Sequence, residues 1–139
     1  DRSEFLAAGT PMYPDIKEPV TDKLFLQEGR KVFREVCPAV SKLISEHLAD
    51  NHIAPDQVKK MWLHQANANM IDLILRSVVG KDADKSIAPM VIAEYANTSS
   101  ASPMIAFHKH QENMQAGDLG VICSFGAGYS IGSVLVKKV

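Results

Sequence analysis

The sequence has 139 residues, with 15 lysines and arginines against 16 aspartates and glutamates, so its formal net charge is -1. A chain of this length forms one domain and buries a core without metal or disulfide support. The balanced charge argues against nucleic acid or an anionic membrane as the main partner, because both attract basic proteins. No apolar run approaches the roughly 20 residues that span a bilayer, and we expect a soluble protein.

The two cysteines, Cys37 and Cys123, both lie in apolar surroundings. Distant cysteines in such settings are typical of buried thiols in a reducing compartment, so we expect a cytoplasmic protein. The chain begins at Asp1 rather than at a methionine. We therefore expect it to be part of a longer protein.

Residues 1–22 contain one glycine and three prolines among mixed polar residues. Because proline interrupts helices, this segment is predicted to be an extended arm or a connection between two halves of a larger protein. Residues 23–139 are predicted to form the domain itself.

The domain is predicted to open with a short strand at residues 24–26. From Gly29 onward, apolar residues recur every three or four positions, which indicates an amphipathic helix. Pro38 lies inside this pattern, so we expect a kink or a break at Cys37.

A second strand is predicted at residues 61–63, followed by a helix over residues 66–79 that Gly80 closes. The apolar residues of this helix cover most of its circumference. A surface helix needs only one apolar face, so we expect this helix to be buried on two sides.

A third strand is predicted at residues 90–93, followed by a polar loop at residues 97–100. The next helix is predicted to be capped by Ser102, to run to about Gln115 and to end at Gly117. Proline directly after Ser102 favours this start, because its missing N–H is not needed in the first helical turn.

The last two strands are predicted at residues 119–123 and 131–136, joined through a turn that contains Gly126 and Gly128. The fold class is therefore α/β, with a mixed five-stranded sheet in the order β-α-β-α-β-α-β-β. Helical crossovers join parallel strands, so the first four strands should be parallel and the fifth antiparallel.

Parallel strands place the loops that follow them at one edge of the sheet, the carboxyl edge, where open α/β folds have their sites. Three loops should meet there, carrying His64, Asn97 and the turn at residues 125–128. Taken singly, each feature is more often structural than catalytic. Together they are uncharged hydrogen-bond donors, a set that suits negative charge developing on an oxygen, as in thioester or enolate chemistry.

Three motifs, in this order, resemble the carboxyl-terminal half of the ketoacyl-acyl-carrier-protein synthase III group of thiolase-like condensing enzymes. They are HQAN at residues 64–67, YANTSSASP at residues 95–103 and GDLGVICSFGAGYSIGSVLV at residues 117–136. The resemblance implies a thiolase-like half-domain, normally part of a five-layer αβαβα architecture, in which the helix at residues 66–79 is buried between two sheets.

The resemblance also implies a decarboxylating Claisen condensation of an acyl thioester with malonyl-acyl-carrier protein, in fatty acid or related polyketide biosynthesis. His64 and Asn97 match the family's catalytic histidine and asparagine, which donate hydrogen bonds to the malonyl thioester carbonyl as it becomes enolate-like. A backbone amide of the turn matches the second oxyanion hole. The turn residues are Phe125, Gly126, Ala127 and Gly128, and the residues expected to support the site are Gln65, Asn67 and Ser99.

The partners implied are an amino-terminal half that carries the catalytic cysteine, a second copy in a homodimer, the acyl-carrier protein, and a starter on coenzyme A or a carrier protein. No metal and no cofactor are expected. His108 and His110, two apart on a helix, point in different directions and cannot close on one ion. The turn at Gly126 resembles a dinucleotide loop, but a strand follows it where a helix would be needed.

The sequence departs from the family pattern at two points. Neither Cys37 nor Cys123 lies at a helix start, where the family's nucleophile is found. Asn69 stands where many members carry an arginine that contacts the carrier's phosphate. One alternative stays open here, namely that the chain is a non-catalytic interaction or dimerisation module that supports a partner's active site.

Overall fold

The computed structural model describes residues 29–126 and 130–139. The predicted arm, the strand predicted at residues 24–26, and Ala127 and Gly128 of the turn lie outside the described residues. The described elements, in chain order, are α2 (Gly29–Asp50), η3 (Pro55–Gln57), β1 (Val58–Leu63), α3 (Ala68–Val78), η4 (Lys85–Ile87), α4 (Ile92–Tyr95), η5 (Ser99–Ala101), α5 (Ser102–His110), β2 (Leu119–Gly126) and β3 (Ser130–Lys137).

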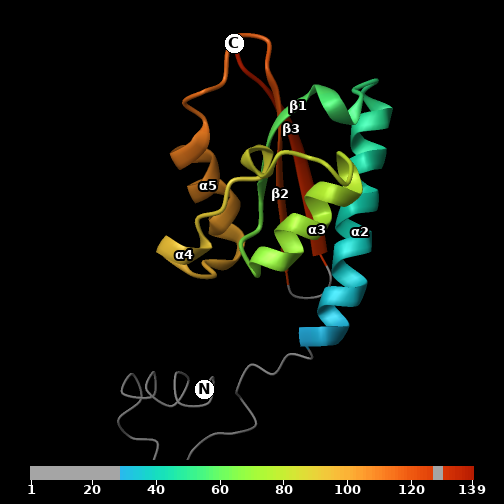
Figure 1. The fold of residues 1–139 in the computed structure, drawn as a ribbon, viewed down its shortest axis with the longest axis vertical. Helices are drawn as coiled ribbons and strands as arrows, with labels where there is room; N and C mark the ends of the chain where they lie inside the picture. Colours follow the sequence, from blue (N-terminus) through green and yellow to red (C-terminus); the bar gives the residue numbers. More distant parts are fainter. Residues whose placement is uncertain (1–28, 127–129) are drawn as a thin grey trace, which may run out of the picture.

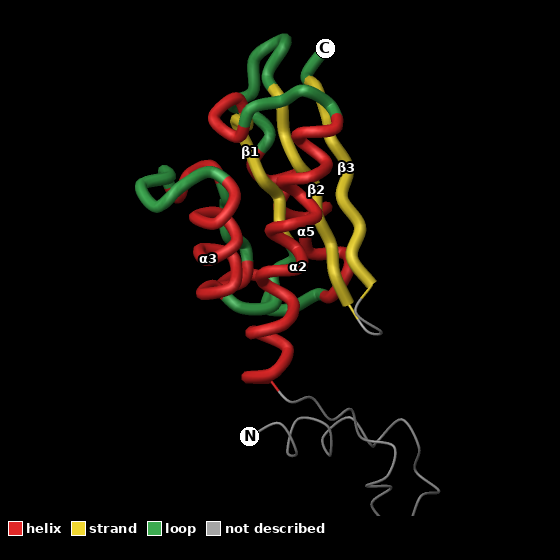
Figure 2. The backbone as a smooth tube through the Cα atoms, turned by 90° about the vertical axis from the view of Figure 1, so that its right-hand side faces the viewer, coloured by secondary structure: helices red, strands yellow, loops and turns green. Residues whose placement is uncertain are grey.

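The three described strands form one sheet in the order β1-β2-β3 and lie side by side in Figure 2. Strand β1 pairs with β2 in parallel, with Leu63 opposite Cys123. Strand β2 pairs with β3 antiparallel, with Gly126 opposite Ser130. The predicted parallel and antiparallel pairings are confirmed for these strands, as is the α/β class.

Helices cover both faces of the sheet, with α2 and α3 on one side and α4 and α5 on the other (Figure 1). Successive strand residues point to opposite faces, so β2 contributes Val121, Cys123 and Phe125 to the core under α2 and α3. The smaller core on the other face is built around Trp62, whose ring meets Phe107 of α5 edge-on at 4.8 Å between centroids. Both cores pack against β1 and β2, the two strands that are followed by predicted site residues.

The strand predicted at residues 90–93 is wrong, because this segment turns into the short helix α4. An apolar run of four residues does not distinguish a strand from a buried helical turn. Pro89 has no N–H to donate, and the N–H of Val91 donates to the Gln65 side chain at 3.0 Å. The Val91 carbonyl in turn accepts from the N–H groups of Glu94 and Tyr95, so neither backbone group of Val91 is left for a neighbouring strand.

Of the kink or break expected at Cys37, the break is wrong, because α2 runs without interruption through Pro38. Pro38 removes the N–H that would bond the Arg34 carbonyl. Both residues are exposed, so water can bond that carbonyl. Val36, Cys37 and Val40 continue the buried face across the proline.

Helix α3 begins at Ala68, with Asn67 as its N-cap, and ends before Gly80, whose φ is 132°. One side of α3 is buried in the described chain and Leu73 on the other is 39 % exposed, so burial between two sheets stays a prediction. Helix α5 ends at His110 instead of about Gln115. The residues after it form turns, and these turns place Met114 in the smaller core around Trp62.

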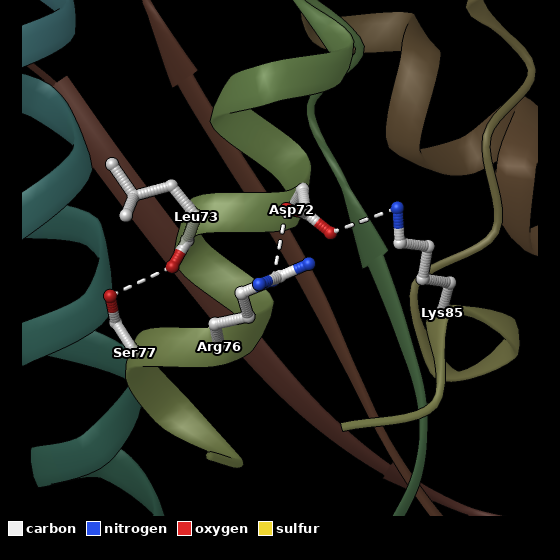
Figure 3. A network of polar contacts seen from close by, with 5 residues as sticks. All are labelled: Asp72, Leu73, Arg76, Ser77 and Lys85. Carbon is white, nitrogen blue, oxygen red and sulfur yellow. Dashed lines mark hydrogen bonds and ion pairs between the residues drawn. The ribbon is translucent and has the colours of Figure 1, made fainter. Parts of the chain in front are cut away.

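The outer face of α3 carries a small charged network (Figure 3). Arg76 Nε lies 3.0 Å from one Asp72 oxygen, and Lys85 Nζ of η4 lies 3.6 Å from the other. Asp72 thereby connects α3 to the segment that leads toward α4.

None of the helices in the described part of the chain combines the length and the hydrophobicity that a membrane span requires.

Candidate active site

His64 is the first residue after β1, and the sheet itself holds it in place. Its N–H donates to the Cys123 carbonyl at 2.9 Å, which extends the β1–β2 pairing by one residue beyond Leu63. The side chain is only 5 % exposed. The structure therefore brings the carboxyl ends of β1 and β2 together at His64, as the parallel topology predicts.

The imidazole of His64 lies between two residues of β2. Its ring is 4.5 Å from the Phe125 ring between centroids, tilted by 36°. The Ser124 hydroxyl lies 3.5 Å from Nδ1. Burial lowers the pKa of His64 from its ordinary value of 6.5, because the cation loses solvation. The ring is thus neutral at pH 7, with one nitrogen free to donate and one to accept.

Gln65 is fully buried, and both ends of its amide are bonded. Its Nε2 donates to the carbonyl of Leu63 at 2.9 Å and to that of Pro89 at 3.4 Å. Its Oε1 accepts from the Val91 N–H at 3.0 Å. The side chain therefore joins the end of β1 to the segment that precedes α4.

Asn67 and Asn69 lie at the start of α3 and are both exposed. The Asn67 side chain accepts from the Asn69 N–H at 2.8 Å, as an N-cap does. Asn67 thus fixes the direction in which α3 leaves the His64 loop.

Asn97 lies in the loop after α4 and is exposed. Its Oδ1 accepts from the Ser99 N–H at 2.9 Å, which orients the amide so that Nδ2 remains available as a donor. Ala96 and Ser99, on either side of this segment, both have φ of 55°. Among the described residues, no hydrogen bond joins Asn97 directly to His64, so the loop that carries Asn97 reaches the His64 loop by other contacts.

Two serines, Ser102 and Ser124, take part in these contacts, and sequence reasoning did not identify either as a site residue. The sequence predicts Ser102 to be a helix cap, but it is the first residue of α5, with Ala101 at the cap position, and its buried hydroxyl accepts from the Gln65 N–H at 2.9 Å. Ser124 could have been found from the parallel register alone, because it follows Cys123, the residue paired with the end of β1.

Only part of the predicted oxyanion turn is described. Phe125 and Gly126 are the last residues of β2, and Gly126 pairs with Ser130. Phe125 is buried against His64, whereas Gly126 is exposed.

Both cysteines are free and buried, as predicted. Burial raises the pKa of the Cys37 thiol, and it raises the pKa of Cys123 to about 12. Only a thiolate attacks a thioester, so neither residue is suited to be a nucleophile at neutral pH. His108 and His110 lie exposed in the last turn of α5, and the described residues contain no group of three or more side chains placed to hold a metal ion.

The parallel β1–β2 pair, the antiparallel β3, the helices on both faces and the histidine at the carboxyl edge define a half-domain of the thiolase-like class. Residues 48–138 match the family described as 3-Oxoacyl-[acyl-carrier-protein (ACP)] synthase III C terminal, and the chain belongs to this family.

The chain is 59 % identical over 117 residues to the Beta-ketodecanoyl-[acyl-carrier-protein] synthase of Pseudomonas aeruginosa, a match that covers 84 % of this chain and 33 % of that protein. It is 33 % identical over 138 residues to the Beta-ketoacyl-[acyl-carrier-protein] synthase III of Lactobacillus delbrueckii subsp. bulgaricus, covering 97 % of this chain and 42 % of that protein. The chain thus spans between 33 % and 42 % of the length of these two relatives.

Among solved structures, the 3-oxoacyl-[acyl-carrier-protein] synthase III of Aquifex aeolicus superimposes with a TM-score of 0.75 at 26 % identity, over 86 % of this chain and 39 % of that one. The corresponding enzyme of Pseudomonas aeruginosa gives 0.73 at 24 % identity, over 87 % and 38 %. These matches confirm the predicted thiolase-like fold.

Proposed function

We propose that this chain is the enolate-stabilising half of a β-ketoacyl synthase, an acyltransferase that condenses an acyl thioester with malonyl-acyl-carrier protein. The observation that carries the proposal is His64, which is buried, neutral and held at the carboxyl edge of the sheet. A neutral imidazole in a desolvated site donates a hydrogen bond to an oxygen without placing a full charge there.

In the proposed reaction, the bond between the malonyl carboxylate and its α-carbon breaks and releases carbon dioxide. The electron pair stays on the α-carbon and is shared with the thioester oxygen, which becomes enolate-like. The α-carbon then attacks the carbonyl of an acyl group held on a cysteine of the amino-terminal half, and the cysteine sulfur leaves as thiolate.

His64 and Asn97 are the donors that stabilise the enolate oxygen. When the Ser124 hydroxyl donates to Nδ1, the remaining proton of the His64 ring resides on Nε2 and can be donated to the substrate. Asn97 donates through Nδ2, because its oxygen is held by Ser99. Gln65, Asn67 and Ser99 hold the two loops.

The second oxyanion hole, which faces the acyl-cysteine, is assigned to a backbone amide of the turn formed by Phe125, Gly126, Ala127 and Gly128. A backbone donor survives the presence of alanine at position 127, because the side chain takes no part.

The assembled enzyme, meaning this chain together with its amino-terminal half, is proposed to be a cytoplasmic homodimer that receives its starter from coenzyme A or a carrier protein. The 59 % identity to a β-ketodecanoyl synthase supports a β-ketodecanoyl product. Because malonyl adds two carbons, the starter would be two carbons shorter than that product. Asn69, at the start of α3, stands where many family members have an arginine. The contact proposed there with the phosphate of the carrier protein therefore lacks a positive charge.

The assignment is tested with His64→Ala and Asn97→Asp in the assembled enzyme. Release of carbon dioxide from malonyl thioester should fall on the order of 100-fold or more in each variant, because each loses one oxyanion donor. Acylation of the cysteine, followed by intact mass, should remain close to that of the parent. His108→Ala, on the exposed face of α5, is the control. Unchanged decarboxylation in His64→Ala would overturn the proposed function.

A further inference from the structure

The hydroxyl of Ser102 connects the His64 loop to the Asn97 loop. It accepts a hydrogen bond from the Gln65 N–H at 2.9 Å and donates one to the Ser99 carbonyl at 2.7 Å. Gln65 and Ser102 are separated by 37 positions in sequence, and both are fully buried. One oxygen thus sets the distance between the two segments that carry the proposed donors.

Ser99 is held on both of its backbone polar groups. Its carbonyl accepts from Ser102, and its N–H donates to the Asn97 oxygen at 2.9 Å. Its φ of 55° is uncommon for a residue other than glycine and persists only where surrounding contacts impose it. Ser102 and Asn97 are the contacts that do so, and through Ser99 the position of Asn97 depends on Ser102.

Gln65 supplies a second connection on the other side of α4. Its amide bonds Val91 and Pro89, which precede this helix, while its backbone N–H is bonded by Ser102, which follows the Asn97 loop. The segment from α4 to η5, which carries Asn97, is therefore fixed at both ends to the residue next to His64.

We propose that Ser102 is a positioning residue that sets the place of the Asn97 amide relative to His64. This inference rests on the proposed function of the two donors. Rate enhancement by two donors on one oxygen depends on their mutual geometry, and a displacement of about 1 Å can cost about 100-fold in rate. The contribution of Ser102 should therefore appear in decarboxylation and should act through Asn97.

The test is a double-mutant cycle in the assembled enzyme. Ser102→Ala should slow malonyl decarboxylation by about 10-fold to 100-fold while acylation of the cysteine changes less than about twofold. In an Asn97→Ala background the same substitution should change decarboxylation by less than about twofold, since the group that it positions is already gone. Ser100→Ala, at an exposed serine of η5 two residues before Ser102, should leave both rates unchanged.

Ser102→Cys keeps the side chain in place with a weaker hydrogen bond, and it serves if the alanine variant does not fold. It should give a smaller loss of decarboxylation than Ser102→Ala, with the same dependence on Asn97.

An equal loss of decarboxylation with and without Asn97, or an equal loss of acylation and decarboxylation, would show a general structural role and overturn the inference. If Asn97→Ala alone does not slow decarboxylation, then the role proposed for Asn97 is wrong and the inference falls with it. The His64 and Asn97 single variants therefore separate failure of the proposed function from failure of the Ser102 assignment.

Discussion

The two loops that carry the proposed donors are fixed by different means. His64 continues the backbone pairing of β1 with β2 and is 5 % exposed, so its place follows from the sheet. Asn97 is exposed, lies between two residues with positive φ and is held by a side-chain hydrogen bond to Ser99, which Ser102 holds in turn. One donor is therefore placed by topology and the other by a few polar groups, which makes the second more sensitive to single substitutions.

The largest effect on stability is expected from Gln65→Leu, because Gln65 joins the two regions. The substitution leaves the Val91 N–H and the Leu63 carbonyl without their partner. Each buried group that loses its partner costs about 1–3 kcal/mol, so the free energy of unfolding should fall by roughly 3 kcal/mol. Chemical denaturation measures the change. Gln115→Leu, at an exposed position, is the matched control, and an equal effect in both variants would contradict the role of Gln65.

A smaller loss is expected from Gly120→Ala, which perturbs the sheet and leaves the Asn97 loop untouched. A Cβ on Gly120 would lie 2.5 Å from a ring carbon of Trp62 and 3.3 Å from the Lys60 carbonyl. The Trp62 ring is fully buried against α5 and cannot move aside freely, so overpacking should cost about 2 kcal/mol.

Gly132→Ala on β3 is the control for this prediction, because a Cβ there meets nothing within 4 Å. Thermal unfolding should separate the two variants by several degrees. Equal melting temperatures would show that Trp62 does not restrict Gly120.

The sequence predicts the sheet-fixed part of the site better than the loop-fixed part. Parallel pairing and the place of His64 follow from periodicity and the crossover rule, which depend on many residues at once. At residues 90–93 the predicted strand is replaced by α4, and the Val91 N–H before that helix is bonded to the Gln65 side chain. Hydrogen bonds between residues far apart in sequence leave no periodic trace, and for the same reason the sequence does not predict the bond between Ser102 and Gln65.

The two loops also differ in that the His64 side chain can take up a proton and the Asn97 side chain cannot. His64 should therefore make the free energy of unfolding depend on pH. Its pKa is lowered by burial from 6.5, so well above pH 6.5 the ring is neutral in both the folded and the unfolded state. As the pH falls through 6.5, the unfolded chain takes up a proton that the folded chain does not, and stability is lost. His64→Gln removes this contribution, so the parent should lose more stability than this variant between pH 8 and pH 5.

Denaturant unfolding at the two pH values measures this difference, with His108→Gln as the control for an exposed histidine. A parent and a His64→Gln variant that lose the same stability on acidification would show that His64 is as readily protonated in the folded state as in the unfolded state.

The smallest effect is expected from Asp72→Asn, which breaks the charged network on the outer face of α3 (Figure 3). The side chains of Arg76 and Lys85 are 47 % and 70 % exposed, against 27 % for Asp72, so solvent screens the two cations and the loss should stay at about 1 kcal/mol. Asp72 lies on the face of α3 away from the sheet, and neither donor loop is bonded to this network. Decarboxylation should therefore be unchanged, and the stability loss should shrink further in about 1 M salt. A loss of activity in Asp72→Asn would instead mean that the position of η4, which Lys85 ties to α3, is transmitted through Pro89 and Val91 to the Asn97 loop.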